Sequence, residues 1–316
     1  MNERKKLIIL TGPTAVGKTK LSIETARMLN AEIISADSMQ VYKYMDIGTA
    51  KITKEEMEDI THYMVDELEP DEEFNVVVFK KLALKYMDEI YKKGKIPLIV
   101  GGTGFYIQAL LYDIDFSEND DNGLVRAKLE KLAEEKGAEY LYNMLMEVDE
   151  ESASIIHKNN VKKIIRALEY FELTGEKISK HNKEQRQNES PYNFLYLVLN
   201  DDRDKIYERI DKRVDIMINQ GLVEEVKKLK DKGYGKELVS MQGLGYKEIL
   251  EYIEGNITLE EAIYILKRDT RHFAKRQLTW FRREKVTTWI NKSDFKNDSD
   301  ILSYINELAK NKEIIV

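Results

Sequence analysis

The sequence has 316 residues, of which 42% are hydrophobic and 34% are charged, and its formal net charge at pH 7 is −7. This composition excludes a disordered chain, and the negative charge excludes a protein that is basic over its whole surface. Because the sequence contains no cysteine, disulfide bonds, thiolate catalysis and cysteine-ligated metal centres are also excluded. The length predicts one or two domains.

Hydrophobic segments are too short for targeting or membrane insertion. The apolar run behind the charged N-terminus covers only residues 7–10, whereas a signal peptide needs about 7–15 apolar residues. No stretch approaches the roughly 20 apolar residues of a membrane span. We therefore expect a cytoplasmic protein with no membrane segment.

Short apolar runs alternate with helical patterns in the first third of the chain. Runs that are apolar at both odd and even positions predict buried strands of a parallel sheet. The predicted strands are residues 7–10, 32–35 and 96–100, and the predicted helices are residues 18–29, 75–93 and 105–112. This alternation predicts an α/β fold with helices on both faces of the sheet.

The pattern changes after residue 112. Residues 113–123 contain four Asp, one Glu, two Asn and one Gly, which is typical of a linker or exposed loop. Residues 124–182 have amphipathic helical spacing and no strand-like run, and the polar residues 180–191 predict a loop. These features predict a helical insertion.

The α/β pattern then returns. Residues 194–199 predict another buried strand, residues 204–285 are mainly helical, and residues 286–290 predict a short extended piece before a terminal helix. The predicted domains are an α/β core formed by residues 1–115 and 190–316, and a helical insertion domain formed by residues 116–189.

A complete phosphate-binding motif follows the first predicted strand and opens the first helix. It consists of Gly12, Pro13, Thr14, Ala15, Val16, Gly17, Lys18 and Thr19. In such a P-loop the backbone N–H groups and the lysine hold phosphate oxygens, and the final hydroxyl is placed to ligand Mg²⁺. The motif predicts a P-loop core like that of the nucleoside-triphosphate hydrolases. It does not say which diphosphate or polyphosphate is bound.

Asp37 lies just past the carboxyl end of the second predicted strand, at the edge where α/β sheets bind ligands. It can hold Mg²⁺ through water, act as a general base, or cap a turn. The third strand ends in a stretch of glycines interrupted by Thr103. The hydroxyl of Thr103 can contact a ligand or cap the following helix.

A basic helix stands out on this acidic protein. Residues 267–285 contain eight Lys or Arg and two acidic residues. Arg268, Arg271, Lys275, Thr279 and Arg282 follow at steps of three or four residues, which predicts one helix face. Such a face can bind a phosphate backbone, although many charged faces are simply solvated.

The insertion contributes a smaller basic group. Lys158, Lys162, Lys163 and Arg166 lie near the start of a predicted helix, and Arg126 lies in the first helix of the insertion. These residues by themselves fit either a solvated helix face or a nucleic-acid contact.

Taken together, these motifs resemble the tRNA dimethylallyltransferase family, also called the tRNA isopentenyltransferases, over nearly the whole chain. The most specific blocks follow the second strand, at residues 36–42 and 45–51. The segments that carry the resemblance are residues 12–19, 36–42, 45–51, 100–106, 166–169, 243–246 and 275–282.

The resemblance implies transfer of a dimethylallyl group from dimethylallyl diphosphate to N6 of the adenosine immediately 3′ of the anticodon in tRNA. It implies that residues 12–19 hold the diphosphate with Mg²⁺ near Thr19, and that the chain binds the anticodon stem-loop of the tRNA. We expect the chain to be a monomer. The resemblance assigns Asp37 as general base and places Thr103 and Arg126 at the reaction centre. The residues that it places against the tRNA are Asp37, Ser38, Met39, Gln40, Lys162, Lys163, Arg166, Arg271, Lys275 and Arg276.

The sequence departs from some family members in the insertion, where Lys162 and Lys163 replace a Gln-Arg pair. Lysine keeps the charge but not the planar guanidinium, so the contact geometry there differs. The chain also lacks the C-terminal zinc finger of the eukaryotic relatives, as expected for the bacterial form.

Three other functions remain open on the sequence: a P-loop small-molecule kinase, a prenyltransferase acting on free adenine nucleotides, and a non-catalytic RNA-binding protein.

Overall fold

The computed structural model describes residues 4–115, 123–185 and 188–315. The chain divides into two compact units, which we call the core unit and the insert unit. The core unit comprises Met1–Leu111 and Pro191–Val316, and the insert unit comprises Tyr112–Ser190.

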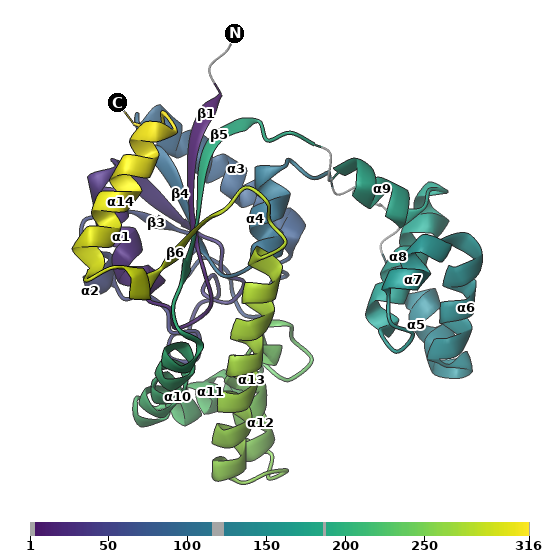
Figure 1. Cartoon of the computed structure of the whole chain (residues 1–316). Helices are drawn as coiled ribbons and strands as arrows, with labels where there is room; N and C mark the ends of the chain where they lie inside the picture. Colours follow the sequence, from purple (N-terminus) through teal and green to yellow (C-terminus); the bar gives the residue numbers. More distant parts are fainter. Residues whose placement is uncertain (1–3, 116–122, 186–187, 316) are drawn as a thin grey trace. The chain divides into compact units, whose positions relative to one another are not determined.

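The core unit is built on a parallel sheet of six strands in the order β3-β2-β4-β1-β5-β6 (Figure 1). The strands are β1 (Lys5–Thr11), β2 (Ala31–Ser35), β3 (His62–Tyr63), β4 (Ile96–Gly101), β5 (Tyr192–Asn200) and β6 (Thr288–Asn291). The predicted P-loop α/β fold is therefore confirmed. Strand β3 was not predicted, because two residues are too few to form a recognisable pattern.

Helices cover both faces of this sheet, which explains the runs of consecutive apolar residues in its central strands. The residues of β1 from Leu7 to Leu10 are at most 1% exposed. Helices α1 (Lys18–Met28) and α14 (Asp298–Asn311) pack on one face, whereas α3 (Val76–Lys92) and α4 (Gly104–Leu111) lie on the other (Figure 1). This arrangement leaves the carboxyl ends of the strands as the place for a site.

Further helices complete the core unit. They are α2 (Lys54–Met57), α10 (Arg203–Asn219), α11 (Leu222–Asp231), α12 (Tyr246–Ile253) and α13 (Leu259–Phe281), with 3₁₀ turns at Ser240–Gln242 and Lys292–Asp294. The predicted basic helix is α13, which begins earlier than residue 267 because Thr258 and Glu261 form a capping box. Ile210 of α10 and Ala274 of α13 pack in one cluster with Ala15 of the P-loop.

The insert unit is helical in the residues that the structure describes. Its helices are α5 (Leu124–Lys136), α6 (Ala138–Val148), α7 (Glu150–Ile155), α8 (Val161–Thr174) and α9 (Ile178–Gln185). The loop predicted from residue 180 is wrong at its start, because α9 continues to Gln185. Lys180 pairs with Glu176 and Glu184 at i,i+4 spacing, which stabilises a helix that has little apolar surface.

Residues 116–122, which belong to the predicted linker, lie outside the described residues. Among the described helices, none combines the length and the apolar character needed to cross a membrane.

Candidate active site

The P-loop connects β1 to α1 through a backbone that requires glycine at its ends. Gly12 has φ +148°, and a Cβ at this position would lie 2.2 Å from the carbonyl oxygen of Leu199. Gly17 has φ 95° and forms the left-handed N-cap of α1. The glycines therefore allow the loop to fold tightly against the neighbouring strand β5, with the N-terminus of α1 directed at the site.

Lys18 lies in the first turn of α1. Its Nζ donates hydrogen bonds to the carbonyl oxygens of Gly12 (2.9 Å) and Pro13 (2.8 Å). Burial lowers the pKa of Lys18 to about 7, with the positive charge of Arg213 acting in the same direction and the negative charge of Asp37 in the opposite one. An anion bound in the loop would therefore strongly favour the charged ammonium group.

The carboxyl ends of β2 and β4 bring two predicted site residues together. Ser35 pairs with Val100 in the sheet, and the N–H of Ala36 donates to the carbonyl oxygen of Val100 (2.7 Å). The N–H of Thr103 then donates to the carbonyl oxygen of Ala36 (3.2 Å). Thr103 is therefore held beside the residue that immediately precedes Asp37, although the two lie far apart in the sequence.

Asp37 is held in place by its own turn. Its Oδ1 accepts hydrogen bonds from the N–H of Met39 (2.9 Å) and Gln40 (3.3 Å). Asp37 therefore caps this turn, which is one of the three roles predicted for it. Because both bonds use Oδ1, this contact orients the carboxylate and remains compatible with a chemical role for Oδ2.

A small pocket joins the P-loop to this turn. Its polar lining includes Lys18, Thr19, Ser22, Ser35, Asp37 and Gln40. Apart from the lysine and the glutamine amide, these side chains offer hydroxyl and carboxylate oxygens, which are the donors that Mg²⁺ prefers. The residues present therefore fit a magnesium diphosphate at the start of α1.

Arg213 is a further charged residue of this site, and no sequence motif indicated it. It lies on α10, and its charge acts on Lys18, whereas the charge of Asp37 acts on Arg213. Burial lowers the pKa of Arg213, and the negative charge of Asp37 partly opposes this shift. A signal was present in the sequence, because Arg213 lies three residues after Ile210 and next to Val214 on the buried face of its helix.

Gln277 of α13 connects two segments of the site. Its Oε1 accepts a hydrogen bond from the N–H of Thr14 (2.9 Å), and its Nε2 donates to the carbonyl oxygen of Gly102 (3.1 Å). The side chain is only 7% exposed. One amide group therefore links the P-loop to the turn that carries Thr103.

We expect Gln277→Leu to destabilise the fold by about 1–3 kcal/mol, because two buried backbone groups lose their partner. Chemical denaturation of the variant measures this change. Arg276→Leu, at the neighbouring exposed position, is the control and should change stability by less than about 0.5 kcal/mol. Equal effects of the two substitutions would contradict the linking role of Gln277.

The basic residues near the C-terminal end of α13 differ in their surroundings. A hollow on the outer face is lined by His272, Lys275, Arg276, Thr279, Trp280 and Arg283. Arg271 instead forms an ion pair with Asp211 of α10, and its side chain is 25% exposed. Arg271 and Lys275 therefore lie one turn apart on α13 but have different surroundings, because Arg271 pairs with α10 and Lys275 lines the hollow.

In the insert unit, two of the predicted arginines bind the same buried carboxylate. Glu169 of α8 accepts two hydrogen bonds from Arg126 (3.0 and 2.8 Å) and one from Arg166 (2.9 Å). The side chain of Glu169 is 7% exposed, whereas those of Arg126 and Arg166 are nearly half exposed. Lys162 and Lys163 lie exposed in the first turn of α8. The insert unit therefore presents a basic surface at the start of α8.

The chain is similar to known proteins over almost its whole length. A family model described as IPP transferase matches residues 40–284, and a model described as isopentenyl transferase matches residues 5–72. The tRNA dimethylallyltransferase of Lachnoclostridium phytofermentans is 63% identical over 98% of this chain and 99% of its own length. That of Clostridioides difficile is 53% identical over 96% of this chain and 98% of its own length.

Solved structures give the same result. The full-length tRNA isopentenylpyrophosphate transferase from Bacillus halodurans is 42% identical with a TM-score of 0.74, and the match covers 98% of both chains. A eukaryotic dimethylallyltransferase that acts on tRNA is 30% identical with a TM-score of 0.84, over 97% of this chain and 80% of its own. The chain therefore belongs to the IPP transferase family, together with these tRNA dimethylallyltransferases.

Proposed function

We propose that this protein transfers the dimethylallyl group of dimethylallyl diphosphate to N6 of the adenosine immediately 3′ of the anticodon in tRNA. The observation that supports this proposal most directly is the placement of Asp37 and Thr103 beside a P-loop. The family of the chain supports dimethylallyl transfer to tRNA, because its relatives are named tRNA dimethylallyltransferases.

The diphosphate is the leaving group of this reaction. Backbone N–H groups at the C-terminal end of the P-loop, the ammonium group of Lys18 and the guanidinium group of Arg213 hold its charge as the allylic C–O bond breaks. The hydroxyl of Thr19 would hold Mg²⁺, which would neutralise further negative charge on the leaving group when bound.

Asp37 acts on the acceptor. The exocyclic amine of adenine is a poor nucleophile because its lone pair is delocalised into the ring. As the new C–N bond forms, Asp37 accepts a proton from N6. The family resemblance assigns Thr103 and Arg126 to the reaction centre as well, and it assigns Ser38, Met39 and Gln40 to the contact with the adenine.

The tRNA contacts are proposed on both units. The target base is normally stacked and must leave the anticodon loop, at a cost of a few kcal/mol. Basic residues that bind the backbone can offset this cost. The outer face of α13 contributes Lys275 and Arg276, Arg271 lies at its border, and the insertion domain contributes Lys162, Lys163 and Arg166.

Diphosphate binding should depend on the protonation of Lys18. Because its pKa is about 7, most of this group is neutral at pH 8, whereas a bound anion favours the ammonium form. We therefore expect an uptake of roughly one proton when magnesium diphosphate binds at pH 8, and an affinity that falls as the pH rises above about 7. Calorimetry in two buffers of different ionisation enthalpy measures the uptake. An equal uptake by Lys18→Met would contradict this assignment.

The function itself is tested by offering the protein labelled dimethylallyl diphosphate, Mg²⁺ and one of two acceptors. The acceptors are unmodified tRNA with adenosine 3′ of the anticodon, and AMP. Label in the tRNA alone is the expected result. Label on AMP would identify an enzyme of free nucleotides, and ATP-dependent phosphorylation of a small molecule without prenyl transfer would identify a kinase.

A further inference from the structure

Two of the sequence motifs have no role in the reaction as proposed above, namely residues 45–51 and 243–246. Residues 45–51 continue the segment that begins with Asp37, and residues 243–246 include the start of α12. The two motifs meet at a single side chain, Glu225 of α11, which no motif included. This contact is the starting point of the inference.

The carboxylate of Glu225 binds the backbone of one turn. Its Oε2 accepts hydrogen bonds from the N–H groups of Asp46 (3.1 Å) and Ile47 (2.8 Å), and its Oε1 accepts one from the N–H of Gly48 (3.1 Å). The hydroxyl of Tyr246 donates a fourth hydrogen bond to Oε1 (2.7 Å). One carboxylate on α11 therefore fixes the backbone path of three consecutive residues in the turn.

Tyr246 closes this contact from behind. Its side chain is fully buried, and burial together with the charge of Glu225 raises its pKa well above the usual value. A Cβ at Gly48 would lie 2.6 Å from the ring, so only glycine allows this approach. The glycine of one motif and the tyrosine of the other thus pack directly together.

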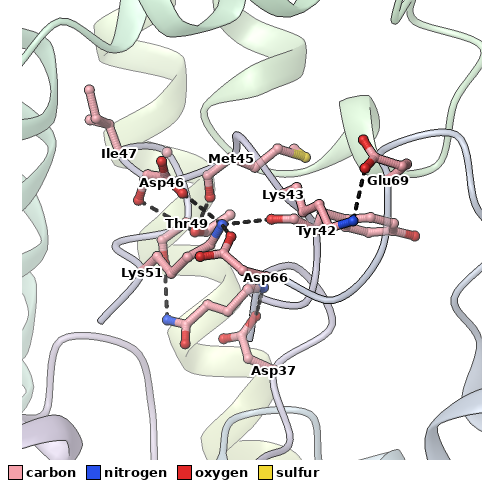
Figure 2. A network of polar contacts seen from close by, with 12 residues as sticks. Asp37, Tyr42, Lys43, Met45, Asp46, Ile47, Thr49, Lys51, Asp66 and Glu69 are labelled. Atoms are coloured by element: carbon pink, nitrogen blue, oxygen red, sulfur yellow. Dashed lines mark hydrogen bonds and ion pairs between the residues drawn. The ribbon is translucent and has the colours of Figure 1, made fainter. Parts of the chain in front are cut away.

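Hydrogen bonds within the segment continue from this turn to Asp37, as Figure 2 shows in part. The Nε2 of Gln40 donates to the carbonyl oxygens of Thr49 (3.3 Å) and Ala50 (3.2 Å), just after the turn held by Glu225. The backbone N–H of the same Gln40 donates to Oδ1 of Asp37. Gln40 therefore links the fixed turn to the carboxylate that is proposed as the general base.

Lys51 holds the same segment from its far end. Its side chain is 4% exposed. Its Nζ donates hydrogen bonds to the carbonyl oxygen of Tyr42 (2.6 Å) and to carboxylate oxygens of Asp46 (2.7 Å) and Asp66 (Figure 2). Lys51 thus closes the loop internally, whereas Glu225 and Tyr246 attach the 46–48 turn to the helices α11 and α12.

We propose that Glu225 is a positioning residue, which holds the 37–51 segment so that Asp37 and Gln40 meet the acceptor adenine in a reactive geometry. This inference rests on the proposed function. Glu225 acts through the backbone of residues 46–48 and does not itself touch either substrate. A displacement of about 1 Å at a reacting group can reduce a rate about 100-fold, so the loss of this contact should be visible in the transfer step.

The test compares Glu225→Gln with Glu224→Gln. Glutamine keeps the shape of the side chain, but its amide N–H₂ replaces one acceptor oxygen and faces backbone donors. Glu224 is the neighbouring exposed residue on the same helix, so its substitution removes the same charge without this contact. We expect Glu225→Gln to lower the single-turnover transfer rate about 10-fold to 100-fold, with an unchanged affinity of this variant for inorganic pyrophosphate. The transfer rate of Glu224→Gln should equal that of the wild-type protein.

Hydrogen exchange of the 45–50 backbone provides a readout that does not depend on activity, and it should accelerate in Glu225→Gln alone. Faster exchange with an unchanged transfer rate would reduce Glu225 to a structural anchor and overturn the proposal. A parallel loss of pyrophosphate affinity would also overturn it, because the P-loop would then be affected as well.

Tyr246→Phe gives a second variant in case Glu225→Gln does not fold. It keeps the ring against Gly48 and removes only the hydroxyl that donates to Glu225, so a smaller loss of the same kind is expected, and no loss would contradict the proposal. If the wild-type protein modifies no tRNA, the proposed function fails, whereas the exchange measurement still reports whether Glu225 holds the turn.

Discussion

Asp37→Asn should reduce dimethylallyl transfer to tRNA by about 100-fold to 10,000-fold, which is the usual contribution of a general base. Asparagine retains the Oδ1 that accepts the N–H groups of Met39 and Gln40, so the turn and the fold should be unchanged. It cannot accept the proton of N6 at neutral pH. Single-turnover kinetics with saturating donor and tRNA measure the loss.

Pyrophosphate binding is the control for this variant, because Asp37→Asn leaves the residues of the P-loop unchanged. The substitution removes a negative charge that raises the pKa of Lys18, so the affinity should fall somewhat, but far less than the transfer rate. Asp37→Ala should lose the activity as well, and should in addition lose about 1 kcal/mol of stability because the turn loses its cap. Wild-type transfer by Asp37→Asn would contradict the assignment of Asp37 as the base.

The second large effect is expected on the outer face of α13. Replacing Lys275, Arg276 and Arg283 together by alanine should weaken tRNA binding about 10-fold or more at moderate salt. It should also lower the salt dependence, with the slope of log K against log salt falling by up to about one for each lost phosphate contact. Binding titrations at several salt concentrations measure both quantities.

Arg271→Ala is the matched control on the same helix, since it removes one positive charge that is paired with Asp211 on the side facing α10. It should reduce the slope by less than any one of the three outer residues. A loss of slope as large as that of Lys275→Ala would mean that Arg271 leaves its partner and binds the tRNA backbone, as the resemblance implied.

The order and type of most core elements could be predicted from the sequence, because buried parallel strands have a strong apolar signal. Residues 7–10 are an example, with β1 extending a little beyond them on either side. Strand β3 has no such signal, since it consists of only two residues. Helix α9 was missed beyond residue 182 because ion pairs, and not an apolar face, support its polar end.

The candidate site was predictable where a local motif carries it and not where distant side chains complete it. The P-loop and Asp37 lie in continuous segments with a recognisable chemistry. Gln277 and Glu225, in contrast, act on backbone groups more than 170 residues away in the sequence, and neither has a local pattern that reveals its partner. Arg213 is an intermediate case. A charged residue on an apolar helix face can be recognised in the sequence as a candidate for burial, but the sequence does not reveal which residue it approaches.

The position of the product in the RNA is the most direct test of the proposed function. Unmodified tRNA is incubated with the protein, Mg²⁺ and dimethylallyl diphosphate, digested into defined fragments, and mapped by mass spectrometry. We expect N6-isopentenyladenosine only at the position immediately 3′ of the anticodon, and no product when that adenosine is replaced by guanosine. Modification at another position, or a folded and diphosphate-binding protein that leaves this tRNA unmodified, would contradict the proposed function.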